Sequence, residues 1–254
     1  MKSATSCLAE IESHRQLADG IYSLWVKAPR IARSVRPGNF LNVRVADGPD
    51  PVLRRPISVC DVKGWSVRLV YRVVGRGTRM LSRFQVGSEI DLLGPLGKPA
   101  PRPPEREVVI CGGGIGIAPL LYLVRDLVGR RRLTVFLGAK NRSELILRRE
   151  FGSLGLRPRL ATDDGSTGHK GPVTEPVLAA AAAARHAAVV ACGPRPMLAE
   201  LVRSLDPVPV WGFVEERLGC GSGICYCCAL PKKSGGYIRF CQEGPVVRLN
   251  GVLL

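Results

Sequence analysis

The stretch Val108-Val-Ile-Cys-Gly-Gly-Gly-Ile-Gly-Ile-Ala-Pro119 decides the fold of the second half of this chain. It is typical of an apolar strand, a glycine turn and the start of a buried helix, whose free N–H groups can hold a pyrophosphate. The candidate nucleotide-binding residues are therefore Gly112, Gly113, Gly114 and Gly116. The spacing departs from the dinucleotide fingerprint, because Ile117 replaces the third glycine and no acidic residue follows about 20 residues later. A tight structural turn is the alternative interpretation.

Apolar runs with few charges alternate with helical stretches after this turn, as in a parallel sheet that is buried on both faces. The expected strands are Val108–Cys111, Leu133–Gly138, Arg159–Thr162 and Ala188–Cys192. The expected helices are Ala118–Val128, Arg142–Leu154 and Glu175–His186, the last with Thr174 as its N-cap. This order predicts a doubly wound α/β domain. Ligands bind at strand C-termini in such sheets, so Cys192 and Gly193 are expected to border a nicotinamide.

The residues before the glycine turn are typical of an all-β domain. Short, partly alternating segments are separated by the turn pairs Pro37-Gly38, Asp47-Gly48 and Lys63-Gly64. The expected strands are Gly20–Lys27, Phe40–Val45, Ile57–Val62, Ser66–Val73 and Glu89–Leu93. This many short strands favours a small antiparallel barrel, closed or nearly closed. Four prolines within Lys98–Pro104 then predict an inter-domain linker.

Two motifs of the expected barrel could hold a diphosphate. Leu53-Arg-Arg-Pro-Ile-Ser58 places two guanidinium groups beside the start of a strand. Val70-Tyr-Arg-Val-Val-Gly-Arg-Gly-Thr78 adds an aromatic ring, another arginine and a turn whose amides can face an anion. Each motif alone is unspecific, because Arg-Pro and Gly-x-Gly are often plain turns. Their occurrence together, upstream of a nucleotide-binding pattern, is the signal.

Five of the nine cysteines crowd the last part of the chain. Disulfides do not persist in the cytoplasm, and no signal peptide is visible in Met1–Gln16, so these cysteines favour metal or redox chemistry. Cys220-x4-Cys225-x2-Cys228, followed by Cys241, has the plant-type [2Fe–2S] spacing. A zinc site is the alternative, but it usually shows two C-x2-C pairs where this chain has one. Cys227 could ligate in place of Cys228, although the x4–x2 spacing favours Cys228.

The formal charge of +16 raises the question of nucleic acid or membrane binding. No basic run is interleaved with aromatic residues, which make up 6% of the chain. The longest uncharged stretch, Val108–Val124, is interrupted by glycines and Pro119, so it does not read as a membrane span. We therefore expect a soluble cytoplasmic protein that binds neither nucleic acid nor membrane, with most of its charge on a solvated surface.

The order of these motifs, with Gly94-Pro-Leu-Gly97 between them, resembles the ferredoxin–NADP reductase superfamily. With the tail Glu216-Arg-Leu-Gly-Cys-Gly-Ser-Gly-Ile-Cys-Tyr-Cys-Cys228 and Phe240-Cys-Gln-Glu-Gly-Pro-Val246, the chain resembles the electron-transfer subunits of class 1B dihydroorotate dehydrogenases. The resemblance covers nearly the whole chain. It implies an FAD-binding barrel over residues 1–102, an NAD-binding α/β domain over 103–208 and a [2Fe–2S] module over 209–254.

The resemblance also implies the site residues. Those for FAD are Arg55, Pro56, Ile57, Ser58, Val70, Tyr71, Arg72, Gly77 and Thr78. The cluster ligands are Cys220, Cys225, Cys228 and Cys241. The implied partner is an FMN-bearing catalytic subunit in a heterotetramer of pyrimidine biosynthesis. Electrons would pass from dihydroorotate through FMN, the cluster and FAD to NAD⁺, and this chain would supply no residue to dihydroorotate itself.

Two departures and two rival interpretations remain. Ser222 stands where the family leads us to expect an apolar residue. Lys140 and Arg142 follow an expected strand at the place where a 2′-phosphate would bind, so NADP remains an alternative to the expected NAD(H). One rival is the small FAD and [2Fe–2S] subunit of a transhydrogenase or sulfide dehydrogenase complex. In those proteins an aspartate often replaces the first cysteine ligand of the cluster. The cysteine at position 220 therefore favours the dihydroorotate enzyme. The other rival, suggested by the positive charge and the cysteines, is a nucleic-acid-binding protein with a structural zinc site. It leaves the flavin-type motifs unexplained.

Overall fold

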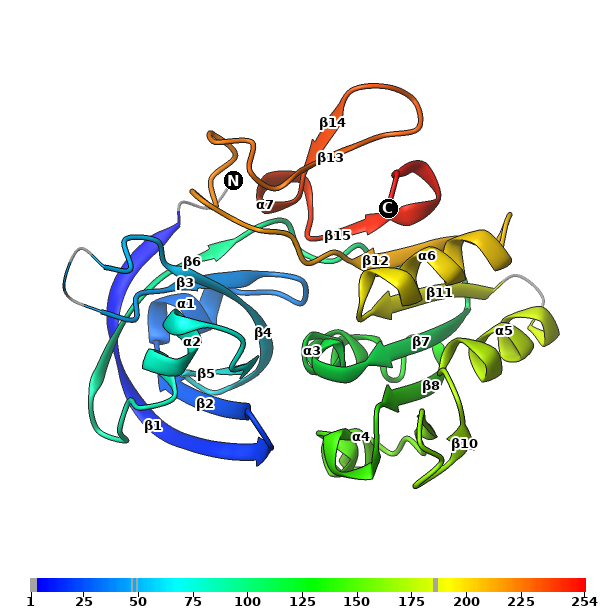
Figure 1. The fold of residues 1–254 in the computed structure, drawn as a ribbon, viewed down its shortest axis with the longest axis horizontal. Coiled ribbons are helices and arrows are strands. Elements are labelled where there is room, and N and C mark those ends of the chain that lie inside the picture. Colours follow the sequence, from blue (N-terminus) through cyan, green and yellow to red (C-terminus); the bar gives the residue numbers. More distant parts are fainter. Residues whose placement is uncertain (1–3, 47, 49, 185–186) are drawn as a thin grey trace.

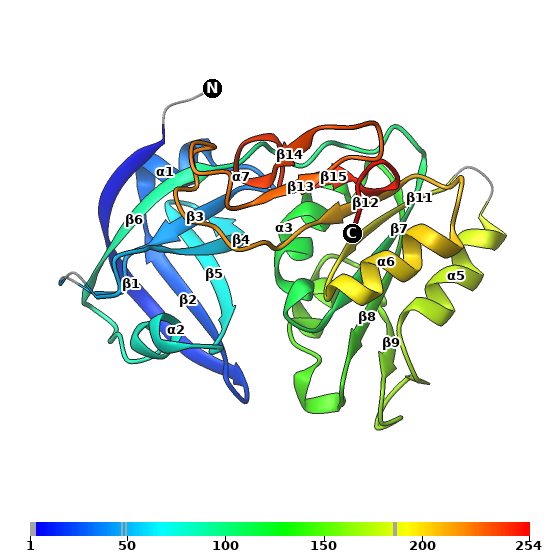
Figure 2. The ribbon, with the colours of Figure 1, turned by 45° about the horizontal axis from the view of Figure 1, so that its top comes forward.

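The structure, a computed structural model, describes residues 4–46, 48, 50–184 and 187–254. A β-barrel and an α/β region lie side by side, and the C-terminal part of the chain crosses over both of them (Figures 1 and 2). The fold expected from the sequence, an antiparallel barrel followed by an α/β nucleotide-binding region and a cysteine-rich C-terminal part, is confirmed.

The barrel is closed by six strands in the order β1-β2-β5-β4-β3-β6, and every neighbouring pair is antiparallel. Its strands are β1 (Thr5–Ala18), β2 (Ile21–Lys27), β3 (Phe40–Val43), β4 (Arg55–Lys63), β5 (Ser66–Arg72) and β6 (Glu89–Leu96). All five strands expected from the sequence are present. β1 was not expected, since charged residues and an irregular register hide its alternation.

Two short helices accompany the barrel, α1 (Pro29–Ser34) and α2 (Arg76–Leu81), and neither was expected from the sequence. Successive side chains of a strand point to opposite faces of the sheet, so each barrel strand contributes to two different cores. On β3, Leu41 and Val43 belong to the barrel core, whereas Phe40 belongs to the core that the α/β region shares with the C-terminal part. The outer face of β3 is therefore an internal contact surface.

The α/β region is built on a sheet of seven strands in the order β10-β9-β8-β7-β11-β12-β15. The strands are β7 (Glu107–Gly113), β8 (Arg132–Ala139), β9 (Arg159–Thr162), β10 (His169–Lys170), β11 (Ala187–Cys192), β12 (Val210–Phe213) and β15 (Val246–Arg248). All pairs are parallel except β12 with β15. Val108 and Ile110 pack on one face, and Val109 and Cys111 on the other.

Helices cover both faces of this sheet, as the doubly wound prediction requires (Figure 1). They are α3 (Ile117–Leu127) and α4 (Arg148–Ser153) on one face, and α5 (Thr174–Ala183) and α6 (Arg195–Ser204) on the other, with the 3₁₀ turns η1 (Gly114–Gly116) and η2 (Arg142–Glu144). No helix in the described part of the chain is long and apolar enough to cross a membrane.

Three details of the helix predictions are corrected. The expected helix Arg142–Leu154 is divided into η2 and α4, because Leu147 takes a left-handed φ of 60° that no continuing helix allows. Thr174 is the first residue of α5 and Val173 is its N-cap, with no side-chain cap. α6 was not expected. The expected helix end at His186 and the turn residue Asp47 lie outside the described residues.

The C-terminal residues 209–254 begin with β12, which pairs with β11, and β15 then returns to the edge of β12. Residues 214–245 lie between β12 and β15 and are called the cysteine segment here. They contain β13 (Ala229–Pro231), β14 (Tyr237–Arg239) and α7 (Phe240–Glu243). The turn η3 (Leu249–Gly251) follows β15. This segment contacts the barrel as well, since Lys98 N–H donates to the Gly244 carbonyl at 2.6 Å.

Ion pairs join the barrel to the α/β region. Asp61, of which 1% is exposed, pairs with Arg125 of α3, and Arg68 pairs with Glu150 of α4 at 3.0 Å. Because desolvation outweighs the nearby guanidinium group, the pKa of Asp61 is raised. The predicted linker is also anchored, through Arg102 and Asp126 at 2.7 Å. These contacts fix the barrel against the α/β region.

Candidate functional site

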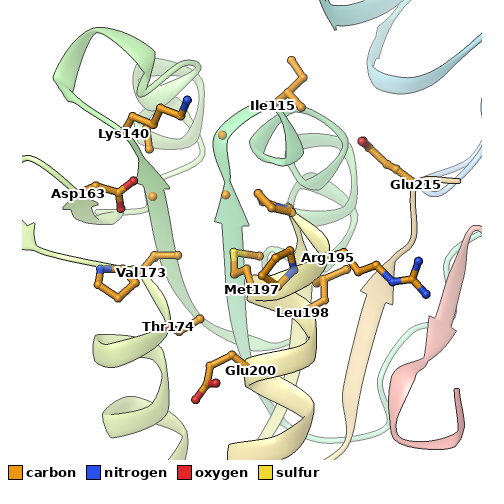
Figure 3. A pocket seen from close by; sticks show the side chains of 18 of the residues that line it. Ile115, Lys140, Asp163, Val173, Thr174, Arg195, Met197, Leu198, Glu200 and Glu215 are labelled. Carbon is orange, nitrogen blue, oxygen red and sulfur yellow. The ribbon is translucent and has the colours of Figure 1, made fainter. Parts of the chain in front are cut away.

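The larger cavity, of about 910 Å³, opens at the C-terminal ends of β7, β8, β9, β11 and β12 (Figure 3). This is the edge at which open parallel sheets bind ligands. Gly113 and Gly114 of the glycine turn line it, as does Gly193 after β11. The two loops meet at Met197: a Cβ on Gly113 would lie 2.7 Å from its Sδ, and one on Gly193 would lie 2.5 Å from its Cε. A side chain at either glycine would require Met197 to move.

The other predicted nucleotide residues lie behind the cavity wall rather than in it. Gly116 is buried, and a Cβ there would run into the carbonyl group of Cys192. A Cβ on Gly112 would lie 3.0 Å from the Ile117 side chain. Cys192 is fully buried and lines neither cavity. These residues let the turn pack on β11, which is a structural role for positions that the motif assigned to binding.

Carboxylates dominate the wall of the larger cavity in spite of the chain's positive charge. They are Glu144, Asp163, Glu175, Glu200, Glu215 and Glu216, against the cations Arg72, Lys140 and Arg195. Lys140 and Asp163 lie together at one end of the cavity, and Glu215 lies near Ile115 at the other (Figure 3). Among the described residues, Asp163 and Glu215 have no ion-pair partner. Arg142 does not line the cavity.

Sequence reasoning did not find Asp163, Arg195, Glu215 or Glu216. Asp163 directly follows an expected strand, so the strand-end rule that selected Cys192 would have found it. Glu215 follows β12, which was not expected. Its side chain has open surface toward the cavity, yet protein atoms crowd it on the other sides, and this desolvation raises its pKa.

The smaller cavity, of about 330 Å³, lies where the barrel, the α/β region and the cysteine segment meet. Eight of the nine predicted flavin residues line it: Arg55, Pro56, Ile57, Ser58, Val70, Tyr71, Arg72 and Thr78. The ninth, Gly77, lies beneath the guanidinium group of Arg55, where a Cβ would collide with it. The residues present therefore form a cradle of the kind that a flavin diphosphate needs.

Two predicted flavin residues are already engaged by neighbours. Arg72 lines both cavities and pairs with Glu144 of η2 at 2.8 Å. The Tyr71 ring stacks on Tyr22 with 5.7 Å between the centroids, and its hydroxyl lies 2.8 Å from His14 Nε2. Because His14 Nδ1 must donate to the Phe84 carbonyl, neutral His14 accepts from Tyr71 at Nε2. The Tyr71 side chain is thus tied to the barrel interior.

The predicted cluster ligands form two pairs. Cys220 N–H donates to Cys225 Sγ at 3.4 Å and Cys225 N–H returns to Cys220 Sγ at 3.5 Å. Cys241 N–H donates to Cys228 Sγ at 3.4 Å. In the described part of the chain, no three such side chains gather closely enough for one metal ion. Four thiols, three of them at the x4–x2 spacing of one loop, are the donor set that a [2Fe–2S] cluster requires.

The two pairs differ in their electrostatics. Desolvation disfavours the Cys220 thiolate, but hydrogen bonds from Ser222 and from the Cys225 backbone outweigh it and lower the pKa of Cys220 to about 5. Burial and the hydrogen bond with Cys228 raise the pKa of Cys241 to about 12. Cys228 is buried and its Sγ accepts from the N–H of Cys241, another predicted ligand, which favours Cys228 over Cys227.

Comparisons with known proteins identify the α/β region and the cysteine-rich C-terminal part. Residues 215–253 match the model of the iron-sulfur cluster binding domain of dihydroorotate dehydrogenase B, and residues 109–203 match the oxidoreductase NAD-binding domain. The chain is 36% identical to the dihydroorotate dehydrogenase B (NAD(+)) electron transfer subunit of Geobacillus kaustophilus, over 96% of this chain and 97% of the relative. It is 39% identical to that of Desulforamulus reducens, over 94% of each.

Solved structures give the same fold. An NADH-dependent reduced ferredoxin–NADP oxidoreductase, studied for flavin-based electron bifurcation, superposes with a TM-score of 0.87 at 30% identity, over 97% of this chain and 90% of that one. A ferredoxin NADP⁺ reductase from Neisseria gonorrhoeae, at 16% identity and a TM-score of 0.67, covers 79% of this chain and 90% of its own, and shows the fold alone. Since full-length relatives match both the glycine turn and the cysteine tail, this chain belongs to the family of dihydroorotate dehydrogenase B electron transfer subunits.

Proposed function

We propose that this chain carries electrons between an FMN-bearing dihydroorotate dehydrogenase catalytic subunit and NAD⁺, as part of a cytoplasmic heterotetramer of pyrimidine biosynthesis. Residues 1–102 would hold FAD, residues 103–208 the nicotinamide nucleotide and residues 209–254 the [2Fe–2S] cluster. The proposal follows from membership in the family and from the way the three sites adjoin.

One observation supports it above the others: the smaller cavity touches both other sites. Cys241, a predicted cluster ligand, lines it on one side. On the other side it shares Arg72, Ile115, Val214, Glu215 and Glu216 with the larger cavity. A group bound there would be within contact of both neighbours, as an intermediate carrier must be.

The residues of each site have separate tasks in this proposal. Arg55 and the turn at Gly77 and Thr78 would hold a diphosphate, while Ser58 and Pro56 shape the wall of the smaller cavity. Flavin bound there supplies the ability to exchange a hydride on one side and single electrons on the other. Cys220, Cys225, Cys228 and Cys241 would hold the cluster through their thiolates.

The larger cavity favours NAD(H) over NADP(H). Among the described residues that line it, Asp163 and Glu215 are the carboxylates without an ion-pair partner, so the extra charge of a 2′-phosphate near either would meet repulsion. Lys140, which the sequence assigns to a 2′-phosphate, lies beside Asp163 (Figure 3). We expect NADH to reduce the bound flavin faster than NADPH does, in stopped-flow measurements at equal concentrations. A preference for NADPH would contradict this assignment.

The decisive experiment separates the cluster from the flavin. A Cys220→Ser variant that retains FAD should lose electron transfer to the catalytic subunit, while NADH still reduces its flavin. Iron and FAD contents must be measured in the same preparation. If transfer to the partner persists without the cluster, the proposed order of carriers is wrong.

A second candidate is the small subunit of a transhydrogenase-type complex. The TM-score of 0.87 to an NADH-dependent reduced ferredoxin–NADP oxidoreductase supports it. The identity of the subunit that co-purifies from the native host separates the two. An FMN protein that oxidises dihydroorotate favours the main proposal.

A further inference from the structure

Two side-chain amides press on the cysteine loop, residues 220–228, without complete hydrogen bonding. Among the described residues, four buried side-chain polar atoms lack a partner: Asn42 Oδ1, Glu105 Oε2, Trp211 Nε1 and Gln242 Oε1. Two of the four therefore belong to amides at this loop. A Cβ on Gly221 would lie 2.5 Å from Asn42 Nδ2, and a Cβ on Gly223 would lie 2.5 Å from Gln242 Oε1.

Asn42 is the more informative of the two, because it comes from a different part of the chain. It is 3% exposed and lies on the outer face of β3, two residues from Phe40, opposite Leu93 of β6. Its neighbours Leu41 and Val43 fill the barrel core. Packing alone would favour an apolar residue at such a position.

The whole amide calls for an explanation, since among the described residues the donor Nδ2 has no hydrogen-bond partner either. A buried polar atom without a partner costs about 1–3 kcal/mol. Nearby Asn39 shows the ordinary arrangement: its Nδ2 donates to the Leu96 and Gly97 carbonyls at 3.1 and 3.0 Å, and its Oδ1 accepts from Arg36 N–H at 2.8 Å. Asn42 has the same burial and no such network. Its N–H₂ group faces Gly221, the residue after the predicted ligand Cys220.

We propose that Asn42 is a positioning residue of the barrel that donates a hydrogen bond from Nδ2 to a sulfur atom of the cluster held by the cysteine loop. Gly221 makes this approach possible, since its φ of 72° and the closeness of Asn42 both exclude a side chain. The inference rests on the proposed function, because it requires the cluster to be bound by this loop.

The expected consequence is electrochemical. Reduction adds negative charge to the cluster, so a donor directed at its sulfur atoms stabilises the reduced form more than the oxidised form. Asn42 would therefore raise the reduction potential of the cluster. The flavin-binding part of the chain would thus adjust the potential of the carrier next to it without being one of its ligands.

The test is an EPR-monitored redox titration of the full chain with FAD and cluster bound. Asn42→Leu keeps the branched shape, with the same number of side-chain heavy atoms, and removes the donor. We expect the reduced cluster to be destabilised about tenfold relative to the oxidised one, which for one electron lowers the midpoint potential by about 59 mV. The FAD midpoint potential in the same samples should not change, because the barrel core is untouched.

Leu93→Ala is the matched control, since Leu93 lies opposite Asn42 and offers no donor. A midpoint potential unchanged in Asn42→Leu, or lowered equally by Leu93→Ala, would overturn the inference. If Asn42→Leu takes up no iron, Asn42→Ala decides in the same way, since it removes the donor without adding charge; an unchanged or higher potential would refute the role. Wild-type protein that takes up zinc or no metal would instead refute the proposed function.

Discussion

The barrel and the cysteine segment differ in what holds them together. The barrel is closed on itself, and its interior is filled by fully buried apolar side chains such as Leu24, Leu41 and Leu69. The cysteine segment has strands of three residues, and its buried side chains, such as Phe240 and Leu230, pack into a core that belongs to the α/β region. Ile224 and Tyr226 are 80% and 58% exposed at the tip of the cysteine loop.

The difference teaches where each part gets its free energy of folding. A closed barrel buries enough apolar surface to order itself. The cysteine segment is too small for a core of its own and depends on its neighbours and on the free energy of binding iron. The stability of the barrel and the iron content of the segment should therefore respond independently to mutations, although the two parts are in contact.

The largest effect is expected at Cys228. Replacing it by serine removes a buried thiol whose sulfur atom accepts from Cys241 N–H, so the segment should lose its iron completely. The barrel should keep its FAD, because none of its core residues is touched. Iron analysis and flavin absorption of the same sample measure both outcomes.

Cys227→Ser is the matched control, since Cys227 is exposed and adjacent. It should retain full iron content. If this variant lost its iron while Cys228→Ser kept it, Cys227 rather than Cys228 would be the cluster ligand. Loss of FAD together with iron would show that barrel and segment are not independent.

A large-to-small substitution in the barrel should produce the opposite pattern. Leu69 is fully buried in the barrel core, and Leu69→Ala should lower the free energy of unfolding by about 2–5 kcal/mol. Urea titration can follow flavin release for the barrel and cluster absorption for the segment. Flavin release should move to lower urea, while the iron content of the folded protein should equal that of the wild type. A fall in iron content would contradict the separation.

The smallest effect is expected at Gly77. The Cβ of Gly77→Ala would displace the Arg55 guanidinium group from the predicted diphosphate site. FAD should bind about tenfold more weakly, a loss of about 1.4 kcal/mol, with no change in iron. Gly75→Ala is the control, because a Cβ there meets nothing within 4 Å. Equal losses in both variants would mean that helix α2, rather than Arg55, was disturbed.

Much of this architecture could be predicted from local sequence signals. Glycine and cysteine spacings located β7, the turn before α3 and the cysteine loop, because close backbone approach and metal ligation each require specific residue types. β1 was missed, since a barrel strand with solvent on one side carries charged residues. β15 was missed because three residues carry no periodic signal.

The candidate site shows the same limit more sharply. The glycine motif identified the loop but not which of its members face the cavity: Gly113 and Gly114 do, while Gly112 and Gly116 pack against Ile117 and Cys192. Asp163 and Glu215 line opposite ends of one cavity, although they follow strands that are far apart in sequence. Asn42 has no motif at all. Such residues are defined by tertiary contacts, which spacing along the chain does not encode.

The pairing of β15 with β12 has a consequence for the protein without its metal. Trp211, Gly212 and Phe213 of β12 are paired with β11 on one side and with β15 on the other. β15 follows Cys241 by only five residues, so disorder of the cysteine segment would release it. An unpaired sheet edge is a template for adding strands from other molecules. Iron loss would then expose this edge to strands from other molecules, and aggregation would report the state of the cluster.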